Sequence, residues 1–493
     1  LDGDWVWTAI TDALPTTGAT GNLSVGALAV SPADPETLFL GLGDAFDAEG
    51  RGLYKSTDGG TTWTAATGMG NATRIASILP LDANRILVGT NAGLKISTDG
   101  GATFTSASGD LASGQIWTVK RLSATRLVAS REIDAGGSIY YSADAGATWT
   151  AATITGATSL GRMTLGTSAS STTVAWGMCE NKATSTIHRG LLKTADGGAT
   201  WNFVAAPTVV GGLFQGEGNQ MTSDGSQSWY NHGFAVDPND VNKVFMGSNL
   251  ALYRTTDGGA NWTQLTHWYG HRRVYAHADF HCSAWSTDGS ILFIGNDGGL
   301  MVVRDPYRTA IPDDGANSYT ASVVEFIDNR RNKGLASHLI YNIGSTIAAT
   351  PADSRHRITL GMQDNGTRVR QVDGTLDGSG IFDDRIGGDG FGTVIHPEDG
   401  NLMLGSLYYT SIYKSTDGGT DDFLSSSSGI AEAGNSGSAP FAPKIALGAA
   451  SEPNTVYTFV NTKVYKSTDF GGSWTAMSMG SFSGYIRNVG ASR

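Results

Sequence analysis

The chain has little cysteine, little charge and no long apolar run. Only two of its 493 residues are cysteines, Cys179 and Cys282, and 16% are charged. No apolar stretch approaches the roughly 20 residues that a membrane-spanning helix requires, and the amino terminus lacks a basic segment followed by an apolar one. Membrane insertion is therefore not expected. The two cysteines fit no zinc motif, and they either form a disulfide or remain buried thiols.

Basic residues are outnumbered as well. The chain has 45 acidic and 33 basic side chains, a net charge of −12, which disfavours nucleic acid as a partner. Long amphipathic helical patterns are missing, whereas 67 glycines accompany many Thr, Ser and Asp residues. This composition is typical of short strands joined by tight turns. No nucleophile elbow, phosphate-binding loop or dinucleotide fingerprint is present, which disfavours serine hydrolases and nucleotide enzymes.

A short acidic motif, Ser/Thr-x-Asp-x-Gly-x-x-Trp/Phe, recurs along the chain. Six copies are complete, and a seventh has its aromatic residue displaced by one place to Phe423. Each copy lies between two short strand-like segments, which predicts a β-hairpin whose turn is stabilised by the carboxylate. We expect the aspartates of these boxes to have structural roles; they are Asp58, Asp99, Asp144, Asp196, Asp257, Asp417 and Asp469.

The spacing of the motif predicts the architecture. The first five boxes are about 40 to 60 residues apart, a period suited to four-stranded propeller blades. Degenerate copies at 295–299 and 363–366 divide the longer interval that follows. We therefore expect an all-β fold, a β-propeller of four-stranded blades with about nine to ten units, in one large ring or two smaller rings. The expected units lie near 22–68, 72–107, 114–153, 160–206, 230–268, 276–330, 337–385, 390–428 and 442–478.

Two features fall outside this period. The segments at about 205–229 and 305–336 are polar insertions, which either shape a binding face or are plain surface loops. The terminal segments, at Trp5–Thr8 and Tyr485–Val489, resemble strands of a unit. Either they share a blade, or the chain is a module of a longer surface protein.

The boxes resemble the Asp-box, or BNR, repeats of the sialidase-like superfamily, which includes tandem-propeller xyloglucanases and sortilin-type receptors. Several other segments resemble secreted bacterial proteins described as glycosyl-hydrolase-like: 230–232, 277–281, 295–299, 361–366 and 387–390. The resemblance implies a secreted, extracellular or cell-surface propeller with a polysaccharide or glycan as partner. It implies the fold more strongly than the chemistry, because enzymes and binding proteins share this scaffold.

The alternating residues His277, Asp279 and His281 form the first candidate site. On an extended strand, their side chains would point to one face at intervals of about 6–7 Å. Such a row could bind a divalent metal such as calcium or zinc, or supply acid and base groups to a sugar. Alternatively, the three side chains satisfy one another around a central channel.

Aromatic and cationic residues crowd the segment before this row. Aromatic rings stack on sugars, and arginine holds carboxylates or sulfates in a bidentate manner, although such loops are also common at protein interfaces. The predicted substrate-binding residues are Trp268, Tyr269, His271, Arg272, Arg273, Tyr275, His232 and Gln363.

Two further aspartates, Asp364 and Asp389, lie in glycine-rich turns outside the full boxes. With Asp279 they are candidates for the pair of carboxylates that glycoside hydrolysis requires. Each of them could instead stabilise its turn or bind calcium. The predicted catalytic set is thus His277, Asp279, His281, Asp364 and Asp389.

Two classes of function fit this sequence. The first is a carbohydrate-active enzyme, a glycoside hydrolase or a polysaccharide lyase, that acts on an extracellular polysaccharide. The second is a non-catalytic ligand-binding or adhesion propeller.

Overall fold

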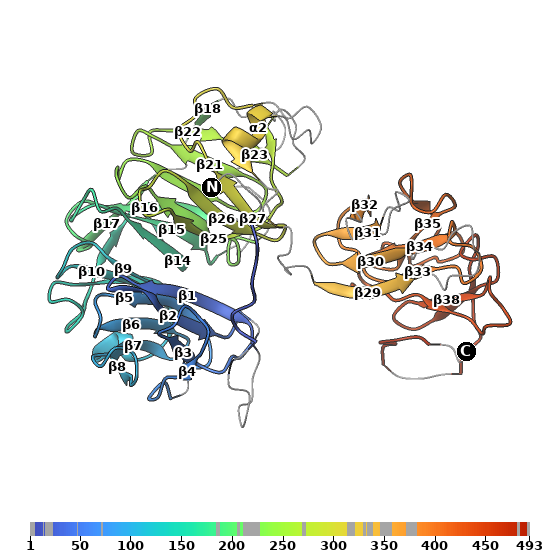
Figure 1. Ribbon diagram of the computed structural model, residues 1–493, viewed down its shortest axis with the longest axis horizontal. Helices are drawn as coiled ribbons and strands as arrows, with labels where there is room; N and C mark the ends of the chain where they lie inside the picture. Colours follow the sequence, from blue (N-terminus) through green and yellow to red (C-terminus); the bar gives the residue numbers. More distant parts are fainter. Residues whose placement is uncertain are drawn as a thin grey trace. The chain divides into compact units, whose positions relative to one another are not determined.

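The computed structural model consists of two compact units, residues 1–335 and 336–493. The residues that the structure describes are 5–12, 14, 23–46, 48–70, 72–183, 188–204, 208–210, 227–268, 273–312, 321–328, 332, 339–345, 357–370, 382–480 and 484–490. Within these ranges, nine sheets have four or five strands and a tenth has two. We number the nine sheets in chain order (Figure 1).

The first unit contains sheets 1 to 6, each an antiparallel meander of four consecutive strands. In sheets 4 and 5 a short extra strand pairs in parallel with the last strand. The strands of sheets 1 to 3 are β1 (Val25–Ser31), β2 (Asp34–Leu42), β3 (Leu53–Ser56), β4 (Thr64–Ala65); β5 (Ile75–Pro80), β6 (Ile86–Thr90), β7 (Gly93–Ser97), β8 (Thr105–Ser106); and β9 (Gln115–Arg121), β10 (Leu127–Ile133), β11 (Gly136–Ser142), β12 (Thr150–Ala151).

Sheets 4 to 6 complete this unit. Their strands are β13 (Thr153–Thr155), β14 (Leu160–Thr167), β15 (Ala175–Asn181), β16 (His188–Thr194), β17 (Thr200–Val204); β18 (Thr208–Val210), β19 (Gly233–Val236), β20 (Val244–Gly247), β21 (Leu252–Thr255), β22 (Asn261–Gln264); and β25 (Phe280–Trp285), β26 (Leu292–Asn296), β27 (Gly299–Val303), β28 (Ile327–Asp328). Strands β23 (Thr266–His267) and β24 (Val274–Tyr275) form the two-stranded sheet.

The second unit contains sheets 7 to 9, again antiparallel meanders of four strands. Their strands are β29 (Ile340–Ser345), β30 (Ile358–Met362), β31 (Gly366–Arg370), β32 (Phe382–Ile386); β33 (Thr393–Ile395), β34 (Met403–Leu407), β35 (Ser411–Ser415), β36 (Leu424–Ser425); and β37 (Ala446–Leu447), β38 (Val456–Phe459), β39 (Val464–Ser467), β40 (Thr475–Ala476). The described helices are short, η1 (Gly109–Ala112) and α2 (Ala321–Phe326), and neither has the length and apolarity to span a bilayer.

The hydrophobic core lies between successive sheets. In the first unit, the first strands β1, β5, β9, β14, β19 and β25 contact one another in chain order. The space between sheets 4 and 5 is filled by large side chains such as Trp176, Tyr253 and Trp262, each fully buried. Replacing one of these tryptophans by alanine typically costs about 3–5 kcal/mol. The sheets are therefore held by face-to-face packing, and this leaves the loops at the strand ends available for function.

The acidic boxes lie in the hairpins between the third and fourth strands of their sheets, as predicted. In the first box, the Ser56 hydroxyl donates to Asp58 Oδ1 at 2.7 Å and accepts the Gly60 N–H at 2.9 Å. The Asp58 carboxylate also accepts the backbone N–H and the hydroxyl of Thr62, at 2.9 and 2.6 Å. These hydrogen bonds lower the pKa of Asp58 to about 2. The box aspartates are therefore engaged in their own turns.

The amino-terminal segment contacts two sheets of the first unit. The Trp5 ring lies 6.2 Å from that of Phe293 in sheet 6, and the carbonyl of Ile10 accepts the indole N–H of Trp63 in sheet 1 at 2.7 Å. Leu14 is buried in the core of sheet 1. No strand is assigned to the described residues 5–12, so the strand expected at Trp5–Thr8 is not formed. The segment instead bridges sheets 6 and 1.

The two cysteines do not form a disulfide. Cys179 is a buried thiol in sheet 4, and Cys282 is an exposed thiol in sheet 6. Burial raises the pKa of the Cys179 thiol well above its ordinary value. The sequence allowed either a disulfide or two thiols, and in the structure both cysteines are free thiols.

We expect Asp144→Ala to destabilise sheet 3 by about 1 kcal/mol, since it removes an exposed acceptor from the hydrogen bonds of one turn. Hydrogen bonds from Thr148 and Ser142 lower the pKa of Asp144 to about 2. Its contribution is therefore present above the ordinary carboxyl pKa of about 4 and is lost as the pH falls toward 2. Calorimetry should show a lower thermal midpoint at pH 7, and the difference should shrink as the pH falls through about 2.

The control for this variant is Asp134→Ala, which removes an exposed carboxylate from another turn of sheet 3. Equal losses of stability in the two variants at pH 7 would contradict a specific role of the box.

Candidate functional site

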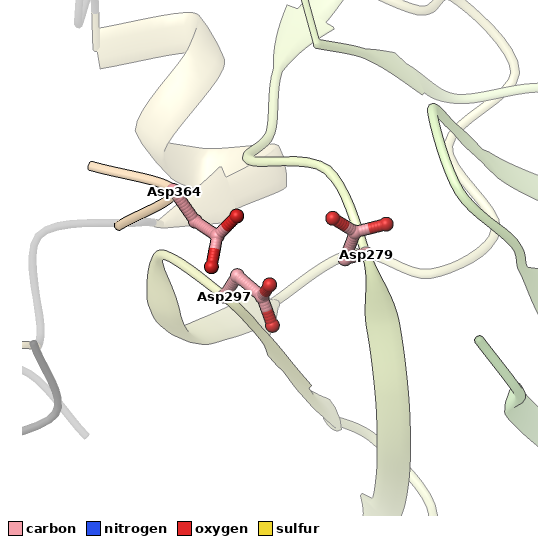
Figure 2. Close-up of side chains that lie close together, drawn as sticks. All are labelled: Asp279, Asp297 and Asp364. Carbon is pink, nitrogen blue, oxygen red and sulfur yellow. The ribbon is translucent and has the colours of Figure 1, made fainter. Parts of the chain in front are cut away.

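Two aspartates of sheet 6 lie side by side in the first unit. Asp279 immediately precedes β25, and Asp297 is in the two-residue turn between β26 and β27. Because Phe280 pairs with Asn296 across β25 and β26, the two aspartates meet at one end of the sheet. Their carboxylate oxygens lie within 4.8 Å of each other (Figure 2). Asp364, which Figure 2 also labels, belongs to the second unit and is described with that unit below.

The carboxylate of Asp279 is held by two asparagines of sheet 5. Asn231, which precedes β19, donates its side-chain N–H to Asp279 Oδ1 at 2.6 Å, and Asn249, which follows β20, donates to the same oxygen. The backbone N–H of Asp279 is bonded to the carbonyl of Asn249 at 2.6 Å. Asp279 also has a left-handed φ of 63°, an uncommon conformation for a residue other than glycine. The surrounding contacts therefore fix this side chain in an otherwise unfavourable backbone geometry.

Burial raises the pKa of the Asp279 carboxyl above its ordinary value, and the negative charge of Asp297 raises it further. The hydrogen bonds from Asn249 and Asn231, and the neighbouring His281, act in the opposite direction without cancelling the effect. A proton on Asp279 is thus favoured at a pH where an exposed aspartate would be ionised.

Asp297 is paired with a histidine. His281 Nε2 lies 2.5 Å from Asp297 Oδ1, and the imidazole is about one-third exposed. The Tyr230 ring packs edge-on against the imidazole, with centroids 4.7 Å apart. The two carboxylates therefore have different environments: Asp279 is half-buried among asparagines, and Asp297 contacts His281.

A half-buried arginine positions Tyr230. The guanidinium of Arg162, on β14, stacks on Phe46 and Trp117 at 5.3 and 4.8 Å. It donates to the backbone carbonyl of Tyr230 at 2.5 Å and to that of Trp229 at 3.3 Å. Burial lowers the pKa of Arg162 to about 10, so it stays charged at neutral pH. Arg162 therefore fixes the loop that places Tyr230 against His281.

The expected row of His277, Asp279 and His281 on one strand face is wrong. Strand β25 begins only at Phe280, and the left-handed turn at Asp279 breaks the alternation before it. His277 packs against the turn of β26 and β27: its carbonyl accepts the Asn296 side chain at 3.2 Å, and a Cβ on Gly298 would lie 2.5 Å from His277 Cβ. The described part of the chain does not gather the three residues into one set of metal ligands.

The predicted substrate-binding residues have several placements in the first unit. His232 is buried, with Nδ1 2.9 Å from the Thr164 hydroxyl and Nε2 2.8 Å from the Ser228 carbonyl, so its ring is inaccessible to a polysaccharide. Arg273 donates to the carbonyl of Gln264 at 3.0 Å. Trp268 and Tyr275 are half-buried; Tyr269, His271 and Arg272 lie outside the described residues.

The remaining predicted residues form a turn in the second unit. Asp389 Oδ1 accepts the backbone N–H of Asp364 at 2.8 Å, and Asp364 has a left-handed φ of 60°. Next to it, Gln363 Oε1 accepts the Tyr341 hydroxyl at 3.1 Å. Asp389 thus stabilises this turn, one of the alternatives that the sequence left open.

Sequence reasoning missed Asp297, Asn231, Asn249 and Tyr230. Asp297 was assigned only to a degenerate box. The usable signal was that its hairpin, Asn296–Gly299, lacks the preceding Ser/Thr and the following aromatic residue that make the other boxes self-contained.

Comparisons with known proteins concern the fold. No protein-family model matches the chain, and no curated protein matches it. Among solved structures, a GH74 enzyme of Niastella koreensis is 19% identical with a TM-score of 0.57, and covers 92% of this chain and 65% of its own. The GH74 xyloglucanase of Xanthomonas campestris is 18% identical with a TM-score of 0.56, and covers 92% of this chain and 72% of its own. The chain is an all-β propeller.

The propeller thus spans about two-thirds of the length of these structures. At this level of identity the likeness extends to the fold alone, because unrelated functions share one scaffold. The chemistry of the site depends on its own residues, Asp279, Asp297 and His281.

We expect Asp279→Asn to stabilise the propeller at neutral pH. Ionisation of Asp279 is unfavourable in the folded state, so stability is lost as the pH rises from about 4 through the raised pKa. Asparagine keeps an acceptor for Asn231 and Asn249 and tolerates the left-handed φ. The thermal midpoint should rise by a few degrees at pH 7. This gain should disappear below about pH 4, where both the wild-type side chain and asparagine are neutral.

A lower midpoint for Asp279→Asn at pH 7 would contradict the unfavourable ionisation of this carboxyl. Asp288→Asn, an exposed aspartate of the same sheet whose pKa is lowered to about 2 by hydrogen bonds, is the control and should not be stabilised.

Proposed function

We propose that the propeller is a secreted glycoside hydrolase whose catalytic residues include Asp279 and Asp297. The observation that supports this proposal is the proximity of two carboxylates with different environments, one favouring the protonated form and the other paired with a histidine. Glycoside hydrolysis requires such a division of roles between an acid and an ionised carboxylate. The printed name of the Xanthomonas structure, a xyloglucanase, adds support for a polysaccharide substrate.

Asp279 would be the general acid. Its proton passes to the glycosidic oxygen as the C–O bond breaks, and the leaving sugar departs as an alcohol. Asn231 and Asn249 fix the carboxyl for this transfer, because both hydrogen bonds converge on the same oxygen and leave the other for the proton.

Asp297 would be the nucleophile. One oxygen of Asp297 lies within 4.8 Å of one oxygen of Asp279. This proximity favours a retaining enzyme, in which the two carboxyl groups are roughly 5–5.5 Å apart, over an inverting one, in which they are roughly 6.5–9.5 Å apart. Asp297 would form an ester with the anomeric carbon, and water, deprotonated by the Asp279 carboxylate, would then displace it. His281 would orient Asp297 through the 2.5 Å contact.

Hydrolysis is to be tested on a panel of neutral and uronate-bearing polysaccharides that includes xyloglucan. We expect Asp279→Asn and Asp297→Asn to lower kcat by about 10²–10⁴-fold, whereas Asp288→Asn has no effect. Product analysis by NMR should show retention of the anomeric configuration. The rate should fall as the pH rises through the raised pKa of Asp279, since only the protonated form is an acid.

Four outcomes would contradict this proposal. Products with unsaturated ends would indicate a lyase, and inverted products would remove Asp297 as nucleophile. Glycan binding by the wild type without turnover would favour the non-catalytic alternative. Asp279 and Asp297 also offer oxygen ligands of the kind that calcium prefers. Loss of activity in EDTA that is restored by calcium would therefore assign the pair to a metal.

A further inference from the structure

A group of aromatic rings in the second unit has no part in the site described above. Tyr408 and Phe441 have side chains that are 38% and 43% exposed, which is high for large apolar rings. Their planes are parallel within 2°, with centroids 6.2 Å apart. At this separation the rings are offset, so each presents part of its face.

These two rings rest on a buried aromatic base. Phe391 is only 1% exposed, and its ring packs edge-on against Phe441 at 5.1 Å and against Tyr341 at 4.9 Å. Tyr409 lies 5.9 Å from Phe441 and 5.3 Å from Tyr408. The exposed rings are therefore held in place by packing before any ligand binds.

The turn that carries Tyr408 is strained. Between β34 and β35, Tyr409 and Thr410 both have a φ of 56°, where glycine or asparagine is usual. The Thr410 hydroxyl is buried and donates to the carbonyl of Phe459 at 2.9 Å, and the Tyr409 N–H is bonded to the carbonyl of Pro440 at 3.0 Å. Strain that neighbouring contacts maintain is concentrated at functional sites.

Polar groups lie near the rings beside the turn of Asp364 and Asp389. Tyr341, which contacts Phe391, donates its hydroxyl to Gln363, the neighbour of Asp364. The Tyr408 ring lies 3.8 Å from the position of a Cβ on Gly388, next to Asp389. The surface thus combines exposed aromatic faces with side-chain amide and hydroxyl groups at its edge.

We propose that Tyr408 and Phe441 form a glycan-stacking platform, with Tyr341 and Gln363 at its polar edge. A pyranose ring presents polarised C–H groups on its face and hydroxyl groups around its rim. The C–H groups are attracted to the electron-rich face of an aromatic ring, and the hydroxyls need hydrogen-bonding side chains beside it. An extended peptide would instead require backbone partners from a strand edge, or a groove. The ligand class is a chain of neutral pyranose sugars.

The test is binding of soluble glucose, xylose and mannose oligosaccharides to the full chain by titration calorimetry. Tyr408→Ala and Phe441→Ala should each weaken binding about tenfold, because each removes one stacking face. Tyr408→Phe keeps the ring and should bind as the wild type does. Tyr485→Ala is the matched control, since it removes another exposed tyrosine, 65% accessible, from the same unit. Thermal midpoints identify any variant that fails to fold.

The platform is independent of the proposed hydrolysis, and the two can fail separately. Repeating the titrations in the Asp279→Asn background measures binding without turnover. Loss of binding in Tyr408→Ala supports the platform even if no substrate is hydrolysed. Unchanged binding in both alanine variants overturns it, whether or not hydrolysis occurs. Absence of glycan binding by the wild type, or displacement of the glycan by a proline-rich peptide, also overturns it.

Discussion

Hydrogen bonds between a hydroxyl and a carboxylate in the box hairpins are the local constraint on which this propeller depends. In the last box, Ser467 donates to Asp469 at 2.7 Å and accepts the N–H of Gly471 at 2.8 Å, which closes the turn. The closed turn directs Trp474 into the core of the second unit, where it is 4% exposed. Since such side chains fill the space between neighbouring sheets, each correctly closed hairpin supplies packing for its neighbour.

Aspartate has two opposite roles in this chain, and its environment separates them. In the boxes, exposed carboxylates accept several short hydrogen bonds from their own turn, and the pKa of Asp58 falls to about 2. Asp279 is half-buried beside a second negative charge, and its pKa rises. The boxes gain stability from an ionised group, whereas the site holds a carboxyl whose ionisation is unfavourable. A carboxyl whose ionisation is unfavourable in the folded state costs stability at neutral pH, and such carboxyls are common at functional sites.

The box hairpins could be predicted from the sequence because the hydrogen bonds that close each turn, such as those of Ser56 and Asp58, are local. The site could not. Asp279 depends on Asn231 and Asn249, which come from another sheet, and the contact of Asp297 with His281 depends on the register of β25 and β26. The row ending at His281 failed because alternation assumes a continuous strand, and nothing local in His-Ala-Asp-Phe-His reveals a left-handed residue at its centre.

Backbone strain is a feature that the two proposed sites share. Within the described residues, seven positions other than glycine have a positive φ. Ala145 and Phe470 stand between the aspartate and the glycine of their boxes, where the first box has Gly59. Gly59 has a positive φ as well, so the turn itself requires that conformation. Four others lie at or beside the proposed sites. Asp279 belongs to the proposed catalytic pair, Asp364 to the turn that Asp389 stabilises, and Tyr409 and Thr410 to the turn that carries Tyr408. The structure offers no such explanation for Ser159. Glycine would remove the strain at these four positions, yet it would also remove the side chains and loosen the turns that hold them. The strain is therefore a cost of orienting particular side chains. Its concentration at the two proposed sites is a backbone property, separate from the charges at one site and the aromatic rings at the other.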